Sequence, residues 1–185
     1  MTGFEHAPVM RDEIVDAFQP VPEGVVLDAT LGGGGHADAL LDARDDLTVL
    51  GIDRDADALV AATERLADRA DRLMTHRGRF DELDAAMQAH DVDELSGALF
   101  DLGVSSPQLD RPERGFSYRH EGPLDMRMDA TSPWSADDVV NGYGEHELAD
   151  IIHRYGDERF ARRIAAAIVA ARPIESTTHL AEVVT

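Results

Sequence analysis

The chain has 185 residues, which is enough for one domain or for one domain and part of another. Its residues are 43% hydrophobic, so it can form a core, and the absence of cysteine excludes disulfides and thiolate metal sites. The formal net charge is −20, and all 17 basic residues are arginine. A field of this sign repels polyanions, so binding of nucleic acid would need a local basic site or a protein partner.

The sequence contains no apolar run near the ~18 residues of a membrane span and no secretion-type segment at its N-terminus. Together with the lack of cysteine, this favours a cytoplasmic protein without a metal site. The acidic residues are scattered rather than grouped, which fits a high-salt cytoplasm or a GC-rich genome better than a functional acidic patch.

In chain order, the first predicted element is a helix over 9–18, which places Met10, Ile14 and Phe18 on one face. A short apolar run from Val25 to Asp28 then predicts a buried strand. It leads into four glycines, 32–35, and a helix over 37–43. A strand, a glycine turn and a helix together present free backbone N–H groups to a ligand at the helix N-terminus.

A second apolar run, Thr48–Asp53, ends in an acid 19 residues after Gly34. An acid at this distance can accept hydrogen bonds from both hydroxyls of a ribose, so the two stretches predict a site for a nucleoside cofactor. The spacing of the glycines does not show which nucleoside cofactor binds. Gly32, Gly34 and Ala37 satisfy the loose G-x-G-x-x-A of dinucleotide sites, while Asp28, Gly32 and Gly34 satisfy the D-x-x-x-G-x-G typical of S-adenosylmethionine enzymes.

Strands and helices continue to alternate up to about residue 102. Periodicity predicts a helix from about Ala56, a strand over 73–77, a helix marked by Phe80, Leu83 and Met87, and a strand over 97–102. This alternation predicts βαβ units and a parallel sheet, in which ligands bind beyond the carboxyl ends of the strands, near the point where strand order reverses. Asp101 is therefore expected on the same rim as the glycines and Asp53.

Beyond Asp101 the composition changes twice. Small polar residues follow up to Asp110, and arginines then interleave with aromatic residues between Arg111 and Asp129. Such a surface suits phosphates and a stacked base, although its composition fits a salt-bridged loop equally well. After Pro133 the periodicity is purely helical, beginning with a capping box at 135–138. Three groups of apolar residues are each predicted to share one face of a helix: Leu148, Ile151, Ile152 and Tyr155; Phe160, Ile164 and Ile168; and Leu180, Val183 and Val184.

Six segments of the chain fit one known pattern: His6–Met10, Asp28–His36, Gly51–Asp55, Asp101–Arg119, Gly122–Asp129 and Tyr155–Arg172. They resemble the bacterial family of 16S ribosomal RNA cytidine N4-methyltransferases, the MraW/RsmH type. The resemblance covers essentially the whole chain, and its most specific parts are the fourth and fifth segments. It implies an α/β, Rossmann-like, S-adenosylmethionine-dependent methyltransferase fold, with an incomplete parallel sheet and an inserted helical subdomain.

The resemblance also implies the cofactor, the substrate and the residues that bind them. The cofactor is S-adenosylmethionine, and the substrate is one cytidine in the decoding region of small-subunit ribosomal RNA, in the assembled small ribosomal subunit. The residues that match the family's cofactor contacts are Gly34, Gly35, His36, Asp53, Phe80, Asp101 and Gln108.

The chemistry of the reaction limits what the protein must supply. The N4 amine of cytosine is a poor nucleophile, because its lone pair is delocalised into the ring. The methyl sulfonium is already activated, so alignment matters more than a strong base. Acceptors near the amine must stabilise the positive charge that develops on nitrogen. We expect these acceptors to be Asp101 and the carbonyls of Ser105, Ser106 and Pro107, and the RNA contacts to be Arg111, Arg114, Phe116, Arg119 and Arg127.

Members of the family continue beyond the position of Thr185, where they complete the helical subdomain and add the last strands of the sheet. The resemblance therefore implies a C-terminal truncation, with 1–110 as the donor-binding core, 111–134 as a loop that faces RNA, and 135–185 as the start of the helical subdomain. It also implies an unpaired edge on the fourth strand, which invites association such as a homodimer.

Two other interpretations remain open. A nicotinamide-dependent oxidoreductase would use the same glycine loop, but it would leave the segment 101–129 without a role. A non-catalytic RNA- or ribosome-binding remnant would keep the arginines and lose turnover.

Overall fold

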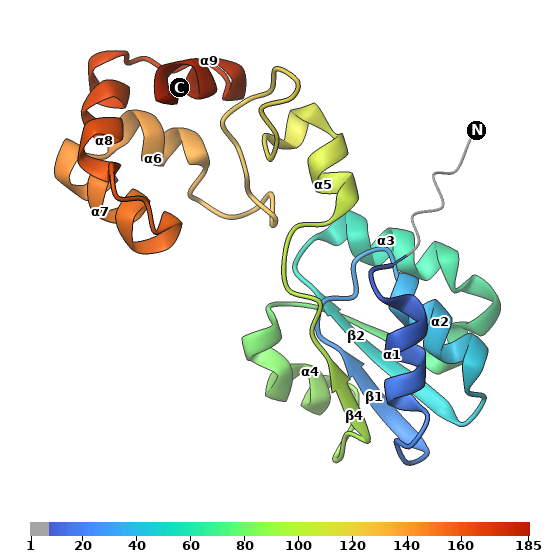
Figure 1. Ribbon diagram of the computed structural model, residues 1–185. Helices are drawn as coiled ribbons and strands as arrows, with labels where there is room; N and C mark the ends of the chain where they lie inside the picture. The colour runs from blue at the N-terminus through green and yellow to red at the C-terminus, as the bar shows by residue number, and fades with distance from the viewer. Residues whose placement is uncertain (1–7) are drawn as a thin grey trace. The chain divides into compact units, whose positions relative to one another are not determined.

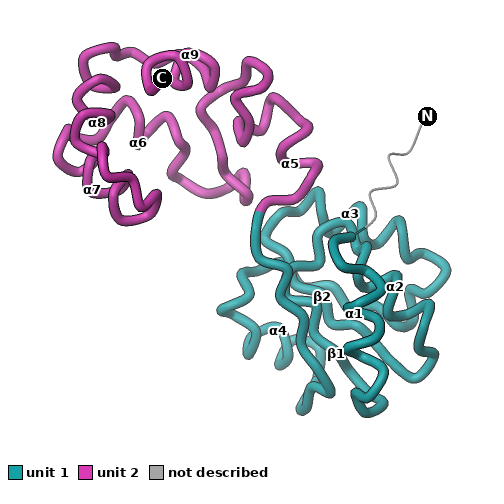
Figure 2. The backbone as a smooth tube through the Cα atoms, in the orientation of Figure 1, with its two compact units in different colours: residues 1–103 teal, residues 104–185 magenta. Residues whose placement is uncertain are grey.

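The computed structural model describes residues 8–185, which form two compact units (Figure 2). The first unit ends at Gly103 and the second spans Val104–Thr185. His6 and Ala7, which begin the first of the six resembling segments, lie outside the described residues. Among the described residues, no helix is both long enough and apolar enough to cross a membrane.

A four-stranded parallel sheet forms the centre of the first unit (Figure 1). The strands are β1 (Gly24–Asp28), β2 (Leu47–Asp53), β3 (Leu73–Arg77) and β4 (Gly97–Leu99), and their order is β3-β2-β1-β4. Strand order therefore reverses at β1, because β2 and β3 follow on one side of it and β4 lies on the other. Open parallel sheets bind ligands at such a reversal, outside the carboxyl ends of the strands.

Helices cover both faces of this sheet. On one face, α1 (Arg11–Phe18), α2 (Gly35–Ala43) and α3 (Ala56–Arg65) pack over apolar residues of the strands, and on the other face α4 (Leu83–Ala89) does so (Figure 1). Two short 3₁₀ turns precede β3 and α4, over Ala67–Arg72 and Phe80–Glu82. Because strands buried on both faces must be apolar on both, β1 and β2 are near-continuous hydrophobic runs, as the sequence predicted.

Two local predictions for this unit are wrong in detail. The fourth strand ends at Leu99, not at 102, because its last ladder bond is from the Ala29 N–H to the Leu99 carbonyl. The chain then turns, and the Asp101 N–H donates to Thr30 Oγ1 at 2.8 Å instead of continuing the ladder. The N-terminal helix begins at Arg11, and Met10, which was predicted on its packed face, is exposed with left-handed backbone.

The second unit is helical. A short helix, α5 (Ser106–Asp110), and a 3₁₀ turn (Pro112–Arg114) lead into an irregular segment, which is followed by α6 (Ala136–Gly142), α7 (Glu145–Gly156), α8 (Ala161–Ala170) and α9 (Thr177–Val184). Its core contains Leu124, Val140, Leu148, Ile168 and Ile174. Leu124 belongs to the irregular segment, so this segment contributes to the core of the unit.

The predicted helix start at Ser135 is confirmed. The Ser135 N–H donates to Asp138 Oδ2 at 2.8 Å, and the Asp138 N–H donates back to Ser135 Oγ. Two aromatic residues that were assigned to packed helix faces are instead at the surface. Tyr155 is 78% exposed, and Phe160, which precedes α8 as its N-cap residue, is 45% exposed.

Candidate cofactor-binding site

The glycine loop joins β1 to α2, and two of its glycines have left-handed backbone. Gly32 has φ 52° and Gly34 has φ 77°, conformations that residues with a side chain adopt only at a cost. A Cβ on Gly34 would also lie 3.1 Å from the Cβ of Ala62 in α3. Gly33 differs from both, because a Cβ there would meet no atom within 4 Å. The loop is thus packed against α3 at Gly34 and open at Gly33.

Asp53, at the end of β2, is tied to this loop. Its Oδ2 accepts a hydrogen bond from the Gly32 N–H at 2.8 Å, and its Oδ1 accepts one from the Asp55 N–H at 2.9 Å. A carboxylate has about four acceptor positions, so these two bonds leave others free. The glycine loop and the acid at the end of β2 are therefore joined, and two hydrogen bonds fix the orientation of the carboxylate.

Asp28, at the end of β1, is an acid buried beneath the loop, with 1% of its surface exposed. Its Oδ1 accepts from the Thr30 N–H at 3.2 Å, while its Oδ2 has no hydrogen-bond partner among residues 8–185. Burial raises the pKa of this carboxyl from 3.8 to about 6, although the bond from Thr30 and the nearby His36 act in the opposite direction. A buried oxygen without a partner is costly, and such groups concentrate at functional sites.

His36 and Asp101 complete the rim at the switch between β1 and β4. The His36 ring is buried, and its Nε2 donates to the Val9 carbonyl at 2.8 Å, which fixes the ring against the N-terminal segment. Its Nδ1 faces Asp101 Oδ2 at 3.9 Å. The Asp101 backbone is anchored to Thr30, as described above, while half of its side chain is exposed. This exposure leaves the carboxylate accessible to a ligand.

Two aromatic rings, those of Phe80 after β3 and Phe100 after β4, contact each other in the first unit. Phe80 and Phe100 form an edge-to-face pair with ring centroids 6.1 Å apart, and they are 44% and 45% exposed. Rings so exposed are available to an apolar or aromatic ligand. The structure therefore gives Phe80 a neighbour that the sequence did not reveal.

The other residues predicted for catalysis or cofactor binding belong to the second unit. The Gln108 side chain is buried, and its Oε1 accepts from the Ser105 N–H at 3.0 Å at the start of α5. Ser106 and Pro107 form the first turn of that helix. The structure thus shows that Gln108 caps the loop in which Ser105, Ser106 and Pro107 were predicted to act.

The arginines predicted to contact RNA fall into two groups. Arg114 donates to the carbonyls of Arg127 and Met128, and Arg127 donates to the Ser132 carbonyl and pairs with Asp125 Oδ2 at 2.7 Å. The pair with Arg127 lowers the pKa of Asp125. These two arginines close the segment 111–134 on itself, whereas Arg111 and Arg119 are exposed and Phe116 is half-buried.

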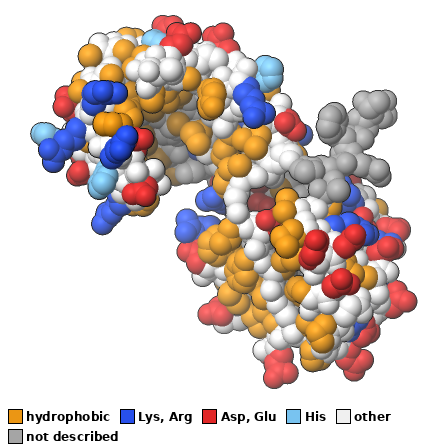
Figure 3. All heavy atoms as spheres, in the orientation of Figure 1, with side chains coloured by type: hydrophobic (Ala, Val, Ile, Leu, Met, Phe, Trp, Pro, Cys, Tyr) orange, Lys and Arg blue, Asp and Glu red, His pale blue; other side chains and the backbone are white. Residues whose placement is uncertain are grey.

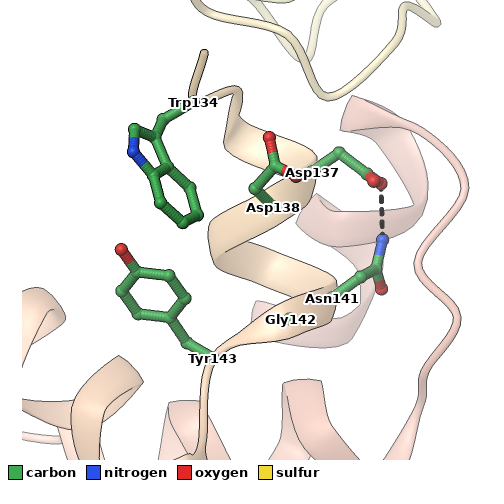
Figure 4. Close-up of a pocket in the computed structure, with 6 residues that line it drawn as sticks. All are labelled: Trp134, Asp137, Asp138, Asn141, Gly142 and Tyr143. Carbon is green, nitrogen blue, oxygen red and sulfur yellow. Dashed lines mark hydrogen bonds between the residues drawn. The ribbon is translucent and has the colours of Figure 1, made fainter.

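The second unit also has a cavity of about 480 Å³ beside α6, lined by Trp134, Asp137, Asp138, Asn141, Gly142 and Tyr143 (Figure 4). Trp134 and Tyr143 form an edge-to-face pair at 6.3 Å. Figure 4 shows the Asp137 side chain pointing away from this pair toward Asn141, whose amide donates to it at 2.7 Å. Because Asp138 is occupied by the helix cap, both carboxylates serve the structure of α6.

A family model described as the MraW methylase family matches residues 3–185 of the chain. The chain belongs to this family. The ribosomal RNA small subunit methyltransferase H of Mycobacterium avium (strain 104) is 50% identical in an alignment of 192 positions, which covers 98% of this chain and 50% of that protein. Its counterpart in Acidiphilium cryptum (strain JF-5) is 51% identical over 98% of this chain and 58% of that protein.

The chain therefore spans about half the length of the curated MraW-family relatives that it matches. A crystal structure of an rRNA methylase from Streptococcus thermophilus aligns with a TM-score of 0.40 and 25% identity over 55% of this chain and 58% of that chain, a score too low to establish a shared fold. The MraW-family membership and the parallel sheet with its flanking helices identify the fold as the Rossmann-like fold of S-adenosylmethionine-dependent methyltransferases.

Three residues of this rim were not among the predicted site residues. Asp28 lies within the D-x-x-x-G-x-G pattern, so its type and position were visible, but its unpartnered oxygen was not. Thr30 and Phe100 carried no signal in the sequence. Thr30 reaches Asp101 because β1 and β4 pair in the sheet. Phe100 follows β4 and meets Phe80 from the segment that follows β3, a contact between two strand ends that are not neighbours in the sheet.

Proposed function

We propose that this chain binds S-adenosylmethionine at the rim of its sheet and serves the methylation of small-subunit ribosomal RNA. The observation that carries this proposal is the convergence of the glycine loop, Asp53, Asp28 and Asp101 at the strand-order reversal. The relatives at about 50% identity, which are named ribosomal RNA small subunit methyltransferase H, support ribosomal RNA as the substrate.

The residues present fit this donor in three respects. Gly33 offers backbone without steric obstruction, while Gly32 and Gly34 hold the loop shape that exposes it. The Asp53 carboxylate is fixed and retains acceptor positions for two ribose hydroxyls. Asp28 has a buried, unpartnered oxygen that would be satisfied by an ammonium or by a water bound to one.

The aromatic pair Phe80 and Phe100 and the polar residues of the rim would contact other parts of the donor. Phe80 and Phe100 would pack against the adenine, and His36 would hold the start of α2 in place through Val9. Gly35 begins α2, so its N–H lies at the positive end of a helix. Gln108 is assigned to the donor by the family resemblance alone, and its observed bond to Ser105 gives it a second role as a support for that loop.

For the methyl acceptor, we propose the exocyclic N4 amine of a cytidine, as the family resemblance implies. When bound, S-adenosylmethionine supplies a methyl group that is already activated as a sulfonium. Asp101 would accept a hydrogen bond from the amine and so stabilise the positive charge that develops on nitrogen. The carbonyls of Ser105, Ser106 and Pro107 would be the other acceptors. The sulfur–methyl bond of the donor would break as the carbon–nitrogen bond forms, and the amine would lose one proton to water.

Calorimetric titration of the chain with S-adenosylmethionine, with NADH as the control ligand, tests the donor. The proposal predicts saturable binding of S-adenosylmethionine alone, and binding of NADH alone would favour an oxidoreductase. A methyl-transfer assay on unmethylated small ribosomal subunits, read by mass spectrometry of the nucleosides, then tests the acceptor. Methylation at any atom other than cytidine N4 would contradict the proposed chemistry.

A further inference from the structure

Most arginines of this acidic chain already have a partner. Arg44, Arg69, Arg79 and Arg127, for example, form ion pairs with nearby aspartates, and Arg72 donates to backbone carbonyls. Among residues 8–185, the arginines whose guanidinium has neither a hydrogen bond nor an ion pair are Arg119, Arg154, Arg159, Arg162 and Arg163.

Four of these five arginines lie within ten residues, where α7 ends and α8 begins. We call this group the hairpin patch: Arg154, Arg159, Phe160, Arg162 and Arg163, with Tyr155 beside them. All six residues are exposed. The stretch 154–163 contains only two acids, and the Glu158 carboxylate already accepts a hydrogen bond from the Phe160 N–H at 2.7 Å. In Figure 3, arginine side chains (blue) gather on the helical unit beside exposed hydrophobic side chains (orange).

The centre of the hairpin patch is one aromatic ring with two guanidinium groups over it. The Cζ of Arg159 lies 4.6 Å from the centroid of the Phe160 ring, and that of Arg163 lies 5.1 Å from it. Stacking of this kind orients a guanidinium through its face and leaves its N–H edges free to donate. Fixed donor edges are suited to the paired oxygens of a phosphate.

We propose that the hairpin patch is an RNA-binding surface that contacts the phosphates of a single-stranded segment with Arg159 and Arg163 and stacks an unpaired base on the Tyr155 ring, which is 78% exposed. This inference rests on the proposed function, because it takes its partner to be the RNA substrate. It adds a contact surface outside the segment 111–129, to which the sequence had assigned RNA binding.

The charge balance of the chain favours RNA over an acidic protein. At a net charge of −20, a polyanion can approach only where basic residues are grouped and unpaired, and the hairpin patch is such a place. An acidic peptide would need only the arginines. The exposed Tyr155 ring beside them provides the kind of stacking surface that proteins use for unpaired bases.

Binding of a short, labelled, single-stranded RNA of mixed sequence, measured by fluorescence anisotropy over a range of salt concentrations, tests this surface. The test variant is Arg159→Gln/Arg163→Gln, and the matched control is Arg11→Gln/Arg65→Gln, which makes the same change in net charge on the first unit. Loss of two phosphate contacts should lower the slope of log K against log salt by about 1.4 and weaken binding about tenfold or more. The control pair should change affinity less than about twofold.

A second variant separates stacking from charge. Tyr155→Leu keeps an apolar side chain and leaves the Phe160 ring under the two guanidinium groups. It should weaken RNA binding by about fivefold or more, while the salt slope stays that of the wild type. Circular dichroism and thermal unfolding of each variant show whether it is folded, and binding of S-adenosylmethionine should equal that of the wild type in all of them.

The inference is overturned if both arginine pairs weaken binding equally, if neither pair does, or if the wild type binds polyglutamate as tightly as RNA. The last result would assign the hairpin patch to an acidic protein. RNA binding that depends on the patch, in a chain that binds no S-adenosylmethionine, would contradict the proposed donor site and leave the surface standing. Normal donor binding with unchanged RNA affinity in the variants would contradict the surface alone.

Discussion

The two units of this chain use their polar residues in different ways. In the first, Asp28, His36, Asp53 and Asp101 come from separate stretches of sequence and meet at one edge of a sheet. In the second, Arg114 and Arg127 close an irregular segment on itself, and four of the five arginines without partners among residues 8–185 lie where α7 ends and α8 begins. The carboxyl ends of parallel strands lie at one edge of the sheet, so the topology brings the residues at these strand ends close together. The topology of an irregular segment does not place its side chains at a common edge. Its backbone carbonyls also need hydrogen-bond donors, and they compete with a ligand for the arginine side chains.

If the rim is a donor site, Asp53 should have the largest effect. Asp53→Ala removes the acceptors for two ribose hydroxyls and leaves the Gly32 N–H without its partner, so affinity for S-adenosylmethionine should fall about 100-fold or more. Calorimetry measures this loss. Glu64→Ala, which makes the same charge change on the exposed side of α3, should leave affinity unaltered. Equal affinities for the two variants would show that the rim does not bind the ribose.

The buried Asp28 predicts a pH dependence of stability. In the folded protein its carboxyl keeps a proton up to a pKa of about 6, whereas the unfolded chain releases it near 3.8. The folded state thus binds this proton more tightly, and the stability from this group is present below about pH 4 and lost as the pH rises through 6. The shift corresponds to about 3 kcal/mol.

Asp28→Asn isolates this effect, because the other carboxylates titrate alike in both proteins. The free energy of unfolding of the variant, relative to the wild type, should rise by about 2.4 kcal/mol between pH 4 and pH 7. Denaturant titrations at the two pH values measure it. A difference that does not vary with pH would mean that Asp28 is not buried as a proton-binding group.

The glycine loop allows a comparison of adjacent residues. Gly34→Ala places a methyl group in left-handed backbone and 3.1 Å from Ala62, so it should destabilise the first unit by about 2 kcal/mol. Gly33→Ala meets no atom within 4 Å and should cost less than about 0.5 kcal/mol, while it lowers donor affinity. Chemical denaturation and calorimetry check both. The reverse order of stabilities would contradict the loop geometry.

The smallest expected effect distinguishes the two kinds of arginine in the second unit. Arg114→Ala removes two hydrogen bonds to the carbonyls of Arg127 and Met128 and should destabilise this unit by about 1 kcal/mol. Arg119→Ala should leave stability unchanged and weaken RNA binding. Thermal unfolding and RNA anisotropy give the two readouts, and the distinction fails if both variants lose stability alike.

The sequence predicted the rim better than the helical unit, for physical reasons. The run Val25–Asp28, the glycines and Asp53 were sufficient to predict the rim, since strand ends in a parallel sheet share one edge. The family resemblance added His36 and Phe80. The length of β4 was not predictable, because Phe100 and Leu102 are apolar enough to extend the strand but face solvent in the structure.

The helical unit was less predictable because periodicity reports which residues could share a face, not which face is covered. Tyr155 and Phe160 follow the apolar spacing, yet they lie at the end of α7 and just before α8, and both are exposed. Arg114 and Arg127 have the composition of an RNA-binding loop, but carbonyl oxygens of the same segment satisfy them first.

The most direct test of the donor site is nuclear magnetic resonance of the ¹⁵N-labelled chain, titrated with S-adenosylmethionine. We predict that the largest amide shifts fall on Gly32–Gly35, Asp53 and Asp101, with the amides of α7 and α8 unmoved. Shifts confined to the helical unit, or saturable binding without change in the glycine loop, would contradict the assignment of the donor to this rim.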